Sequence, residues 1–179
     1  MKAKRIRGFA TGAGAVALGL TIGAGGLAAQ PGDELAAGIF EGTCGSPGDN
    51  RLFDLGDLEA TDDDDRGRTS TIAGTPVAGP VFEEEDDISA SIDELTATPH
   101  VVLVFASDAA DAPVAACGEI TGEASDGRLR VTLEPVDGSG IGGVATFRPD
   151  NDDTDDDDDQ TEVLVQVQRG VEATGTPTA

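Results

Sequence analysis

The chain has 179 residues and a net charge of −24, with 35 acidic residues against 11 basic ones. A surface of that sign repels the phosphates of nucleic acids and of anionic lipids, which excludes these partners and leaves cations and an unidentified extracellular partner. The length suits one domain behind a short leader segment.

The first 29 residues have the pattern of a secretory signal peptide. Four cations stand within the first seven residues, and residues 8–29 hold no charged residue. A basic start, an apolar stretch and small residues at its end mark such a signal, with cleavage expected after Ala28 or Ala29. We therefore expect a secreted or cell-surface protein. Retention of residues 1–29 as a membrane anchor is the alternative, because the stretch is long enough to span.

Residues 36–169 predict an all-β domain, after a polar lead-in at 30–35 and before a disordered tail at 170–179. Residues 128–133 alternate between apolar and polar, whereas 100–105 form the continuous apolar run of a strand with both faces covered. The expected strands are 36–40, 51–55, 88–92, 100–105, 114–120, 128–133, 141–147 and 163–167. Ile92–Leu95 predicts a turn or one helical turn. About eight short strands suit a sandwich or a Greek-key barrel, and we expect a Greek-key β-sandwich.

Two acidic segments interrupt this strand pattern. Residues 61–87 carry two acidic blocks on either side of a Gly/Pro/Thr-rich stretch, and residues 149–160 include eight Asp within 150–159. Blocks of like charge repel one another and remain solvated, so we expect both segments to be long loops, the second within a hairpin.

Cys44 and Cys117 are the two cysteines of the chain, 73 residues apart. An even pair in a secreted domain most often forms a disulfide, and the spacing is not that of a C-x-x-C redox motif. We therefore expect a structural disulfide between them.

The residues argue against an enzyme. His100 is the single histidine of the chain and adjoins an apolar strand, which favours a structural or surface role over that of a base. The sequence contains neither a G-x-S-x-G elbow nor a phosphate-binding loop. Gly138–Gly143 lies between two strands rather than before a helix, so we expect a hairpin turn there. No catalytic residue and no organic cofactor are predicted.

Calcium is the one metal that the composition favours, because it binds six to eight carboxylate or carbonyl oxygens. Oxygen-bearing residues of the last acidic loop stand at positions 1, 3, 5, 7, 9 and 12 of an EF-hand-like spacing. They are Asn151, Asp153, Asp155, Asp157, Asp159 and Glu162. Position 6, where an EF-hand loop has glycine, is Asp156, and strands replace the flanking helices. Diffuse cation binding by the same charges is the other interpretation.

The segments around the cysteines resemble secreted bacterial domains related to Cu/Zn superoxide dismutases and to CHRD domains. The similar segments are Gly42-Thr43-Cys44, Thr98-Pro99-His100 and Ala115-Ala116-Cys117-Gly118-Glu119-Ile120. The resemblance covers about residues 36–168. It implies a Greek-key β-sandwich and supports the disulfide.

Three positions depart from that family. Its His-x-His pair would fall on Gly38 and Phe40, and a further histidine, five residues after His100, would fall on Phe105. Without these imidazoles, dismutase activity is not implied. We expect a non-catalytic module with an interaction or structural role in a cation-rich setting. The alternatives are a calcium-binding domain and a degenerate domain that binds copper or zinc through His100 and nearby carboxylates.

Overall fold

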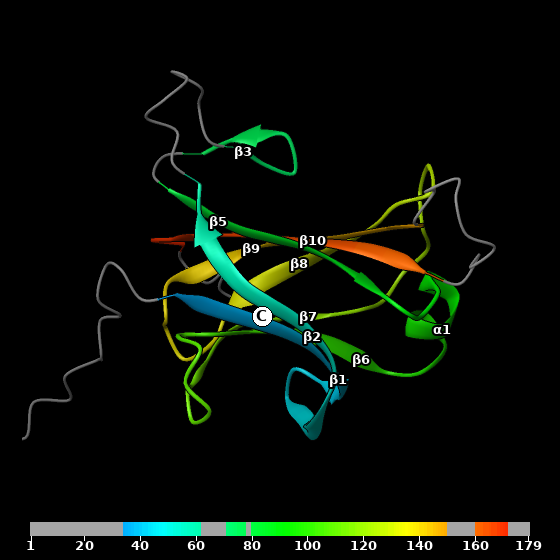
Figure 1. Cartoon of the computed structure of the whole chain (residues 1–179), viewed down its shortest axis with the longest axis horizontal. Coiled ribbons are helices and arrows are strands. Elements are labelled where there is room, and N and C mark those ends of the chain that lie inside the picture. The colour runs from blue at the N-terminus through cyan, green and yellow to red at the C-terminus, as the bar shows by residue number, and fades with distance from the viewer. Residues whose placement is uncertain (1–33, 62–70, 78–79, 150–159, 172–179) are drawn as a thin grey trace, which may run out of the picture.

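A computed structural model of the chain describes residues 34–61, 71–77, 80–149 and 160–171 (Figure 1). The predicted signal peptide, residues 150–159 and residues 172–179 lie outside this part. Its elements, in chain order, are β1 Leu35–Thr43, β2 Ser46–Ala60, β3 Thr71–Ile72, β4 Thr75–Pro76, β5 Val81–Ile88, α1 Ile92–Ala97, β6 His100–Phe105, β7 Val114–Glu119, β8 Leu129–Pro135, β9 Ile141–Pro149 and β10 Thr161–Arg169. Within the described residues, no helix has the length and hydrophobicity that crossing a membrane requires.

Eight of the strands form one closed antiparallel barrel, in the order β1-β2-β5-β10-β9-β8-β7-β6. The barrel closes because β1 pairs with β6 and β10 pairs with β5. The all-β prediction is confirmed, and the wall is continuous rather than divided into the two facing sheets of the expected sandwich. In this order β6 lies beside β1, and β6 to β10 follow one another as a meander.

The crossover that produces this order carries the helix. The segment after β5 passes across one end of the barrel, where α1 lies (Figure 1), and β6 then starts beside β1. Ser91 begins α1 with a reciprocal capping box to Glu94, which satisfies free amide groups of the first turn. Leu95 of α1 is 2% exposed and joins the core at this end of the barrel. The predicted helical turn at Ile92–Leu95 is therefore confirmed as part of α1.

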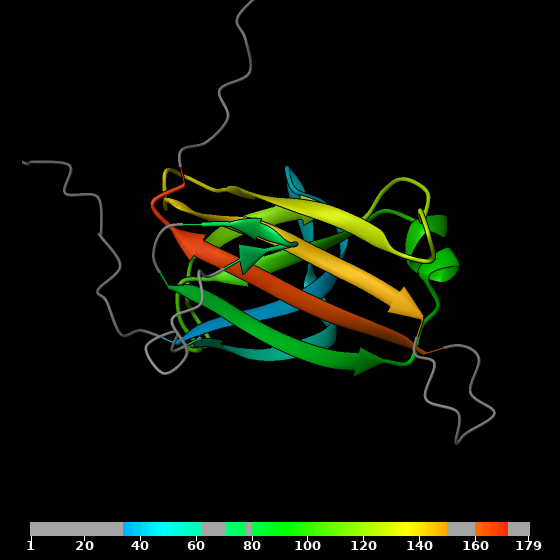
Figure 2. The ribbon, with the colours of Figure 1, turned by 90° about the horizontal axis from the view of Figure 1, so that it is seen from above.

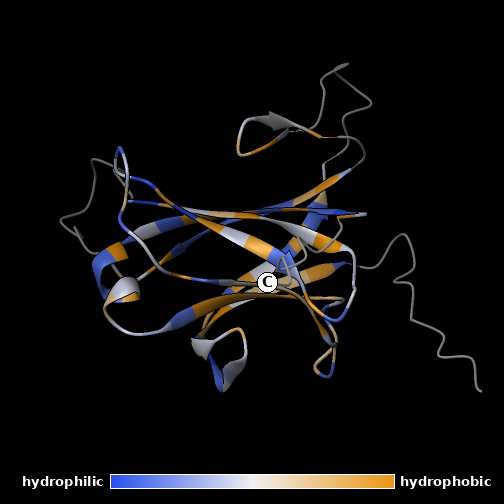
Figure 3. Ribbon diagram, turned by 180° about the vertical axis from the view of Figure 1, so that it is seen from behind, coloured by the Kyte–Doolittle hydropathy of each residue, from blue (hydrophilic) through white to orange (hydrophobic). Residues whose placement is uncertain are grey.

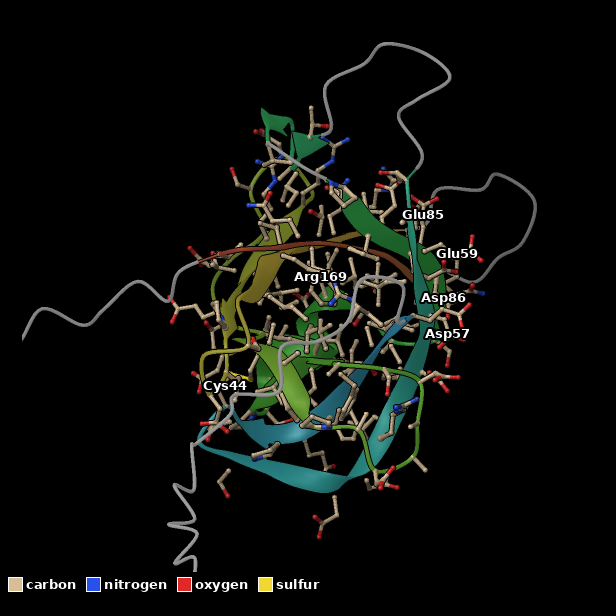
Figure 4. The ribbon with its side chains drawn as sticks, turned by 90° about the vertical axis from the view of Figure 1, so that its left-hand side faces the viewer. Cys44, Asp57, Glu59, Glu85, Asp86 and Arg169 are labelled. Atoms are coloured by element: carbon tan, nitrogen blue, oxygen red, sulfur yellow. A yellow bond between two sulfur atoms is a disulfide. The ribbon has the colours of Figure 1, made fainter. Side chains whose placement is uncertain are left out.

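Apolar side chains fill the barrel interior. β8 alternates between buried and exposed residues, and β10 alternates between buried and half-buried ones, with Val163, Val165 and Val167 fully buried. The same alternation is visible along the ribbon in Figure 3. At the end opposite α1, the guanidinium carbon of Arg169 lies 5.1 Å from the centre of the Phe82 ring, inside the outline of the barrel (Figure 4).

A second, smaller core lies on the outer side of the barrel wall. It consists of Phe40, Val101, Leu103 and Cys117, with Phe105 packed against it at its edge. These residues alternate along β1, β6 and β7 with the residues that face the interior. The prediction that 100–105 is covered on both faces is thus confirmed.

The disulfide predicted between Cys44 and Cys117 is present. Cys44 lies in the tight turn between β1 and β2, and Cys117 lies on β7, so the bond fixes the tip of the β1–β2 hairpin to the outer core. In the chain-entropy account, closing a 73-residue loop contributes about 4 kcal/mol. The bond therefore stabilises the fold and holds the tip of this hairpin in place.

Three local expectations differ from the structure. Residues 81–87 are not loop but most of β5, because buried Val81, Phe82 and Ile88 anchor both ends of the acidic run in the wall. The strand expected over 88–92 ends at Ile88 instead, since the chain bends there to enter α1. β1 already begins at Leu35, within the expected lead-in, because Leu35 is fully buried.

The connection between β1 and β2 is short, although residues 45–50 are rich in glycine, proline and other turn-forming residues. Only Cys44 and Gly45 form the turn, and β2 begins at Ser46. The Gly-rich segment between β8 and β9 is a hairpin connection, as expected. A small β3–β4 hairpin also lies on the outside of the barrel (Figure 2), where the backbone amide of Ala73 donates to Oε1 of Gln166 on β10.

Candidate functional site

The candidate site is a groove of about 690 Å³ on the outer face of the barrel, between β1, β2 and the loop after β6. Its floor is apolar and its rim is acidic. We call it the Arg51 groove, and its principal residues are Phe40, Phe105 and Arg51 with the carboxylates of Asp49, Asp54, Asp57 and Asp108.

Two aromatic rings form the floor. Phe40 on β1 and Phe105 at the end of β6 have their ring centres 5.8 Å apart at an interplanar angle of 60°. Gly38 lies between them on the same face of β1, where a Cβ atom would come within 3.0 Å of Nε of Arg51. The missing side chain therefore lets Arg51 lie across β1 onto both rings.

Arg51 is the cation of the groove. Its guanidinium carbon lies 5.8 Å from the Phe40 ring centre and 5.5 Å from the Phe105 ring centre, which is within cation–π range. Its Nη1 donates to Oδ1 of Asp54 at 2.7 Å. The side chains of Arg51 and Asp54 remain 36% and 68% exposed, so this ion pair contributes at most about 1 kcal/mol.

The disulfide and the hairpin position this groove. β1 is irregular where it carries Phe40, with shifts of register against β2 on either side. Such irregularities bend a strand and redirect its side chains. At the tip of the same hairpin, the Cys44 amide donates to Oε1 of Glu119 on β7 at 3.3 Å. Most of the groove is therefore built on hydrogen-bonded strands, and the loop after β6 completes it.

A second acidic cluster adjoins the groove where β2 meets β5. We call this contact the β2–β5 seam. These two strands, both fully described, pair at two positions, Glu59 with Glu83 and Ala60 with Phe82. Beyond them, the side chain of Glu84 lies 3.5 Å from where a Cβ of Gly56 would be. Figure 4 shows Asp57 and Glu59 of β2 on the same side of the barrel as Asp86 of β5.

The surroundings of Glu84 in the seam disfavour its ionised form. Burial raises the pKa of Glu84, and the charges of Glu59, Asp86 and Asp57 raise it further. Asp57 belongs to both the seam and the rim of the Arg51 groove. A continuous acidic surface thus runs from the groove across β2 to β5.

The predicted calcium ligands are not brought together within the described residues. Asn151, Asp153, Asp155, Asp157 and Asp159 lie outside the described part of the chain. Glu162 is described: it stands near the start of β10, and its Oε1 accepts from Nη2 of Arg148. The same Nη2 donates to Oε2 of Glu85 at 3.0 Å. The residue at position 12 is therefore already engaged by a cation.

His100 has a structural role in this fold. Its Nδ1 lies 2.9 Å from the carbonyl oxygen of Leu95, so the protonated Nδ1 donates to the last turn of α1. His100 stands at the opposite end of β6 from Phe105. In the part of the chain that the structure describes, no three His, Cys, Asp or Glu side chains are placed to hold a metal ion together.

The three positions that depart from the superoxide dismutase-like pattern lie together in space. Gly38, Phe40 and Phe105 all surround the guanidinium group of Arg51. In the sequence these three positions indicate only that histidines are missing, and no motif points to Arg51. The one local feature that could have indicated Arg51 is that an arginine stands in a short apolar strand of a very acidic chain.

The arrangement can bind a positively charged group, since aromatic faces and carboxylates both attract cations. Comparison of the chain with models of known protein families, with curated protein sequences and with solved structures finds no match to any of them.

Proposed function

We propose that the protein is a secreted, non-catalytic interaction module whose Arg51 groove binds a basic segment of a partner protein. The observation that carries this proposal is the pairing of an apolar aromatic floor with an acidic rim in one groove. Four carboxylates, those of Asp49, Asp54, Asp57 and Asp108, line it against the single guanidinium of Arg51.

Charge determines which partner suits this surface. The residues after position 29 include 35 acidic residues and seven arginines, which gives that part of the chain a net charge of −28. Such a field accelerates association with positively charged partners and opposes negatively charged ones. An apolar floor alone would not choose between partners, whereas the acidic rim selects a basic one.

The framework supports binding more than chemistry. The groove stands on paired strands of a barrel with a filled core, and the Cys44–Cys117 bond holds the hairpin that carries Arg51. A pre-ordered surface loses little conformational entropy on binding. His100, the residue best suited to proton transfer, donates instead to α1.

The proposed site of action is outside the cell. The basic and then apolar pattern of residues 1–29 supports export, and a disulfide supports an oxidising compartment. Amino-terminal sequencing of the exported protein tests this part, with the mature chain expected to begin at Ala29 or Gln30. An amino terminus that retains Met1 in a cytoplasmic fraction would contradict it.

Binding is tested with the mature protein and two dye-labelled peptides of equal length, one alternating arginine with leucine and one alternating glutamate with leucine. Fluorescence anisotropy should show saturable binding of the basic peptide alone, weakening as salt rises. The rim variant, Asp49→Asn with Asp57→Asn and Asp108→Asn, should lose about tenfold or more in affinity, from the range for exposed charge pairs.

A matched control separates the groove from overall charge. Glu123→Gln, Asp126→Asn and Asp137→Asn remove three charges from loops outside the groove. Asp126 and Asp137 have left-handed φ angles of 54° and 50°, which asparagine adopts readily. This control should bind the basic peptide as the wild type does at matched ionic strength. Equal losses in the two triple variants would show that net charge, and not the groove, binds the peptide.

A further inference from the structure

We infer that Phe40, Phe105 and Asp54 form a recognition pocket for an arginine side chain of the partner, and that Arg51 occupies this pocket in the free protein. The inference rests on the proposed function and adds to it the residue type that is recognised. It also adds an autoinhibitory contact within the chain.

The pocket offers what a guanidinium group needs. Two ring faces lie within 5.8 Å of the Arg51 guanidinium carbon, and the Asp54 carboxylate accepts a hydrogen bond from its edge at 2.7 Å. A planar guanidinium stacks on aromatic faces and donates from its edge at the same time, whereas a lysine ammonium offers a compact, strongly hydrated charge. The pocket therefore favours arginine over lysine.

Arg51 can leave this pocket at little cost. Its side chain is 36% exposed and the carboxylate that pairs with it, that of Asp54, is 68% exposed, and exposed ion pairs of this kind are weak. The backbone of Arg51 is held by its pairing with Phe40 across β1 and β2, so the side chain can move without opening the hairpin. Arg51 therefore competes with the partner's arginine for the pocket while it remains attached to the same chain.

An arginine of the partner gains more binding free energy in the groove than is lost when Arg51 leaves the pocket. Asp49, Asp57 and Asp108 line the same groove and carry three further negative charges. A peptide with neighbouring cations can satisfy these carboxylates and the pocket together, which Arg51 cannot do alone. Because Arg51 competes for the pocket, the apparent affinity for the partner's arginine falls in proportion to the fraction of protein molecules in which the pocket is free.

The test replaces Arg51 in the mature protein and measures binding of two small probes, N-acetyl-arginine amide and N-acetyl-lysine amide. NMR shifts of the phenylalanine ring signals report occupation of the pocket. Arg51→Met should raise the affinity for the arginine probe by about fivefold or more, from the occupancy argument, and should raise that for the lysine probe less.

Two further variants separate this effect from local charge and from folding. Arg51→Lys keeps the positive charge but not the planar group, so it should also raise the affinity for the arginine probe. Phe105→Leu in the Arg51→Met background keeps an apolar side chain without an aromatic face, and should cancel the gain. Thermal unfolding establishes that each variant is folded.

The outcomes distinguish this inference from the proposed function. If Arg51→Met and Arg51→Lys bind the arginine probe no better than the wild type, while the basic peptide still binds the wild type, the inference is wrong and the proposed function stands. An equal gain for both probes in Arg51→Met, absent in Arg51→Lys, would reduce the effect to charge removal and also overturn it. Failure of the basic peptide to bind any of the folded proteins would overturn both.

Discussion

Glu84 on β5 lies directly opposite Val165 on β10, a residue with no exposed surface in the barrel core. Residues opposite one another in an antiparallel pair project to the same face of the sheet. Glu84 is thus directed toward the inner side of the wall, next to the short two-position pairing of β2 with β5, and its side chain is half-buried there. The charges of Glu59, Asp86 and Asp57 act on it.

This arrangement predicts a pH dependence. The folded-state pKa of Glu84 lies above its ordinary value of 4.5, because burial and the neighbouring charges disfavour the ionised form. The penalty is therefore fully present above the folded pKa and disappears as the pH falls toward 4.5. Glu84→Gln should raise the free energy of unfolding at neutral pH, and urea unfolding should show that gain shrinking on acidification.

The control for that prediction is Glu134→Gln, an exposed carboxylate on β8 away from the seam. It removes the same charge and reports the benefit of lowering overall repulsion. An effect of Glu84→Gln that equals the effect of Glu134→Gln at every pH would show that the seam adds nothing specific.

Loss of the disulfide should weaken both the fold and the groove. Cys44→Ser with Cys117→Ser should lower the free energy of unfolding by about 4 kcal/mol in the chain-entropy account. The hairpin tip would then lack its attachment to β7, so affinity for the basic peptide should fall as well. Denaturant unfolding with and without reductant measures the first effect, and an unchanged midpoint in the reduced wild type would contradict it.

Gly38→Ala should displace Arg51 without removing it. The new methyl group would stand 3.0 Å from Nε of Arg51 and 3.0 Å from the carbonyl oxygen of Phe53. We expect a loss of about 1 kcal/mol in stability, from the usual cost of overpacking, and a shift of the Arg51 Nε–H NMR signal. Gly45→Ala, where nothing lies within 4 Å of the new atom, is the control and should change neither quantity.

Gly118→Ala should destabilise the barrel at the contact between β7 and β8, outside the residues that line the groove. A Cβ there would come within 2.5 Å of the carbonyl oxygen of Thr132 and 2.6 Å of Cγ1 of Val131, where β7 passes close to β8. Overpacking of this kind costs about 1–3 kcal/mol, and backbone atoms cannot yield as a flexible side chain does. Chemical denaturation against the same Gly45→Ala control checks the prediction. A Gly118→Ala protein as stable as that control would mean that the two strands can separate freely.

Salts should stabilise the protein without preference for calcium. Glu162 is held by Arg148, and the other carboxylates described here respond to screening as a group. Thermal unfolding in sodium, magnesium and calcium chloride at matched ionic strength should therefore give equal shifts. A saturable stabilisation at low calcium that magnesium does not copy would instead support a site in residues 151–162.

Much of the wall could be predicted from local patterns. The alternation in β8 and the continuous apolar run of β6 each determine a strand and its faces. β5 was not predicted as a strand, because its five consecutive acidic residues are typical of a solvated loop. Phe82 and Ile88, which hold it in the wall, can be recognised as core residues only when β10 is known to pair beside it. A strand that is held by a distant partner carries little local signal.

Neither the closure of the barrel nor the formation of the groove could be predicted from local sequence patterns. Eight strands can form a sandwich or a barrel, and the difference here is whether β1 reaches β6. The Arg51 groove likewise depends on the register that sets Arg51 opposite Phe40, and on the approach of the Phe40 and Phe105 rings to 5.8 Å. The cysteine pair was predictable because the chain has just two cysteines.

The strand order also delays one pairing during folding. β5 has one long ladder, to β10, in which Ile88 pairs with Thr161, so its main partner lies 73 residues further along the chain. Before β10 pairs, β5 has two pairing positions with β2 to hold it. Pairing across such separations folds slowly, and the acidic run of β5 keeps an unpaired strand soluble until β10 is in place.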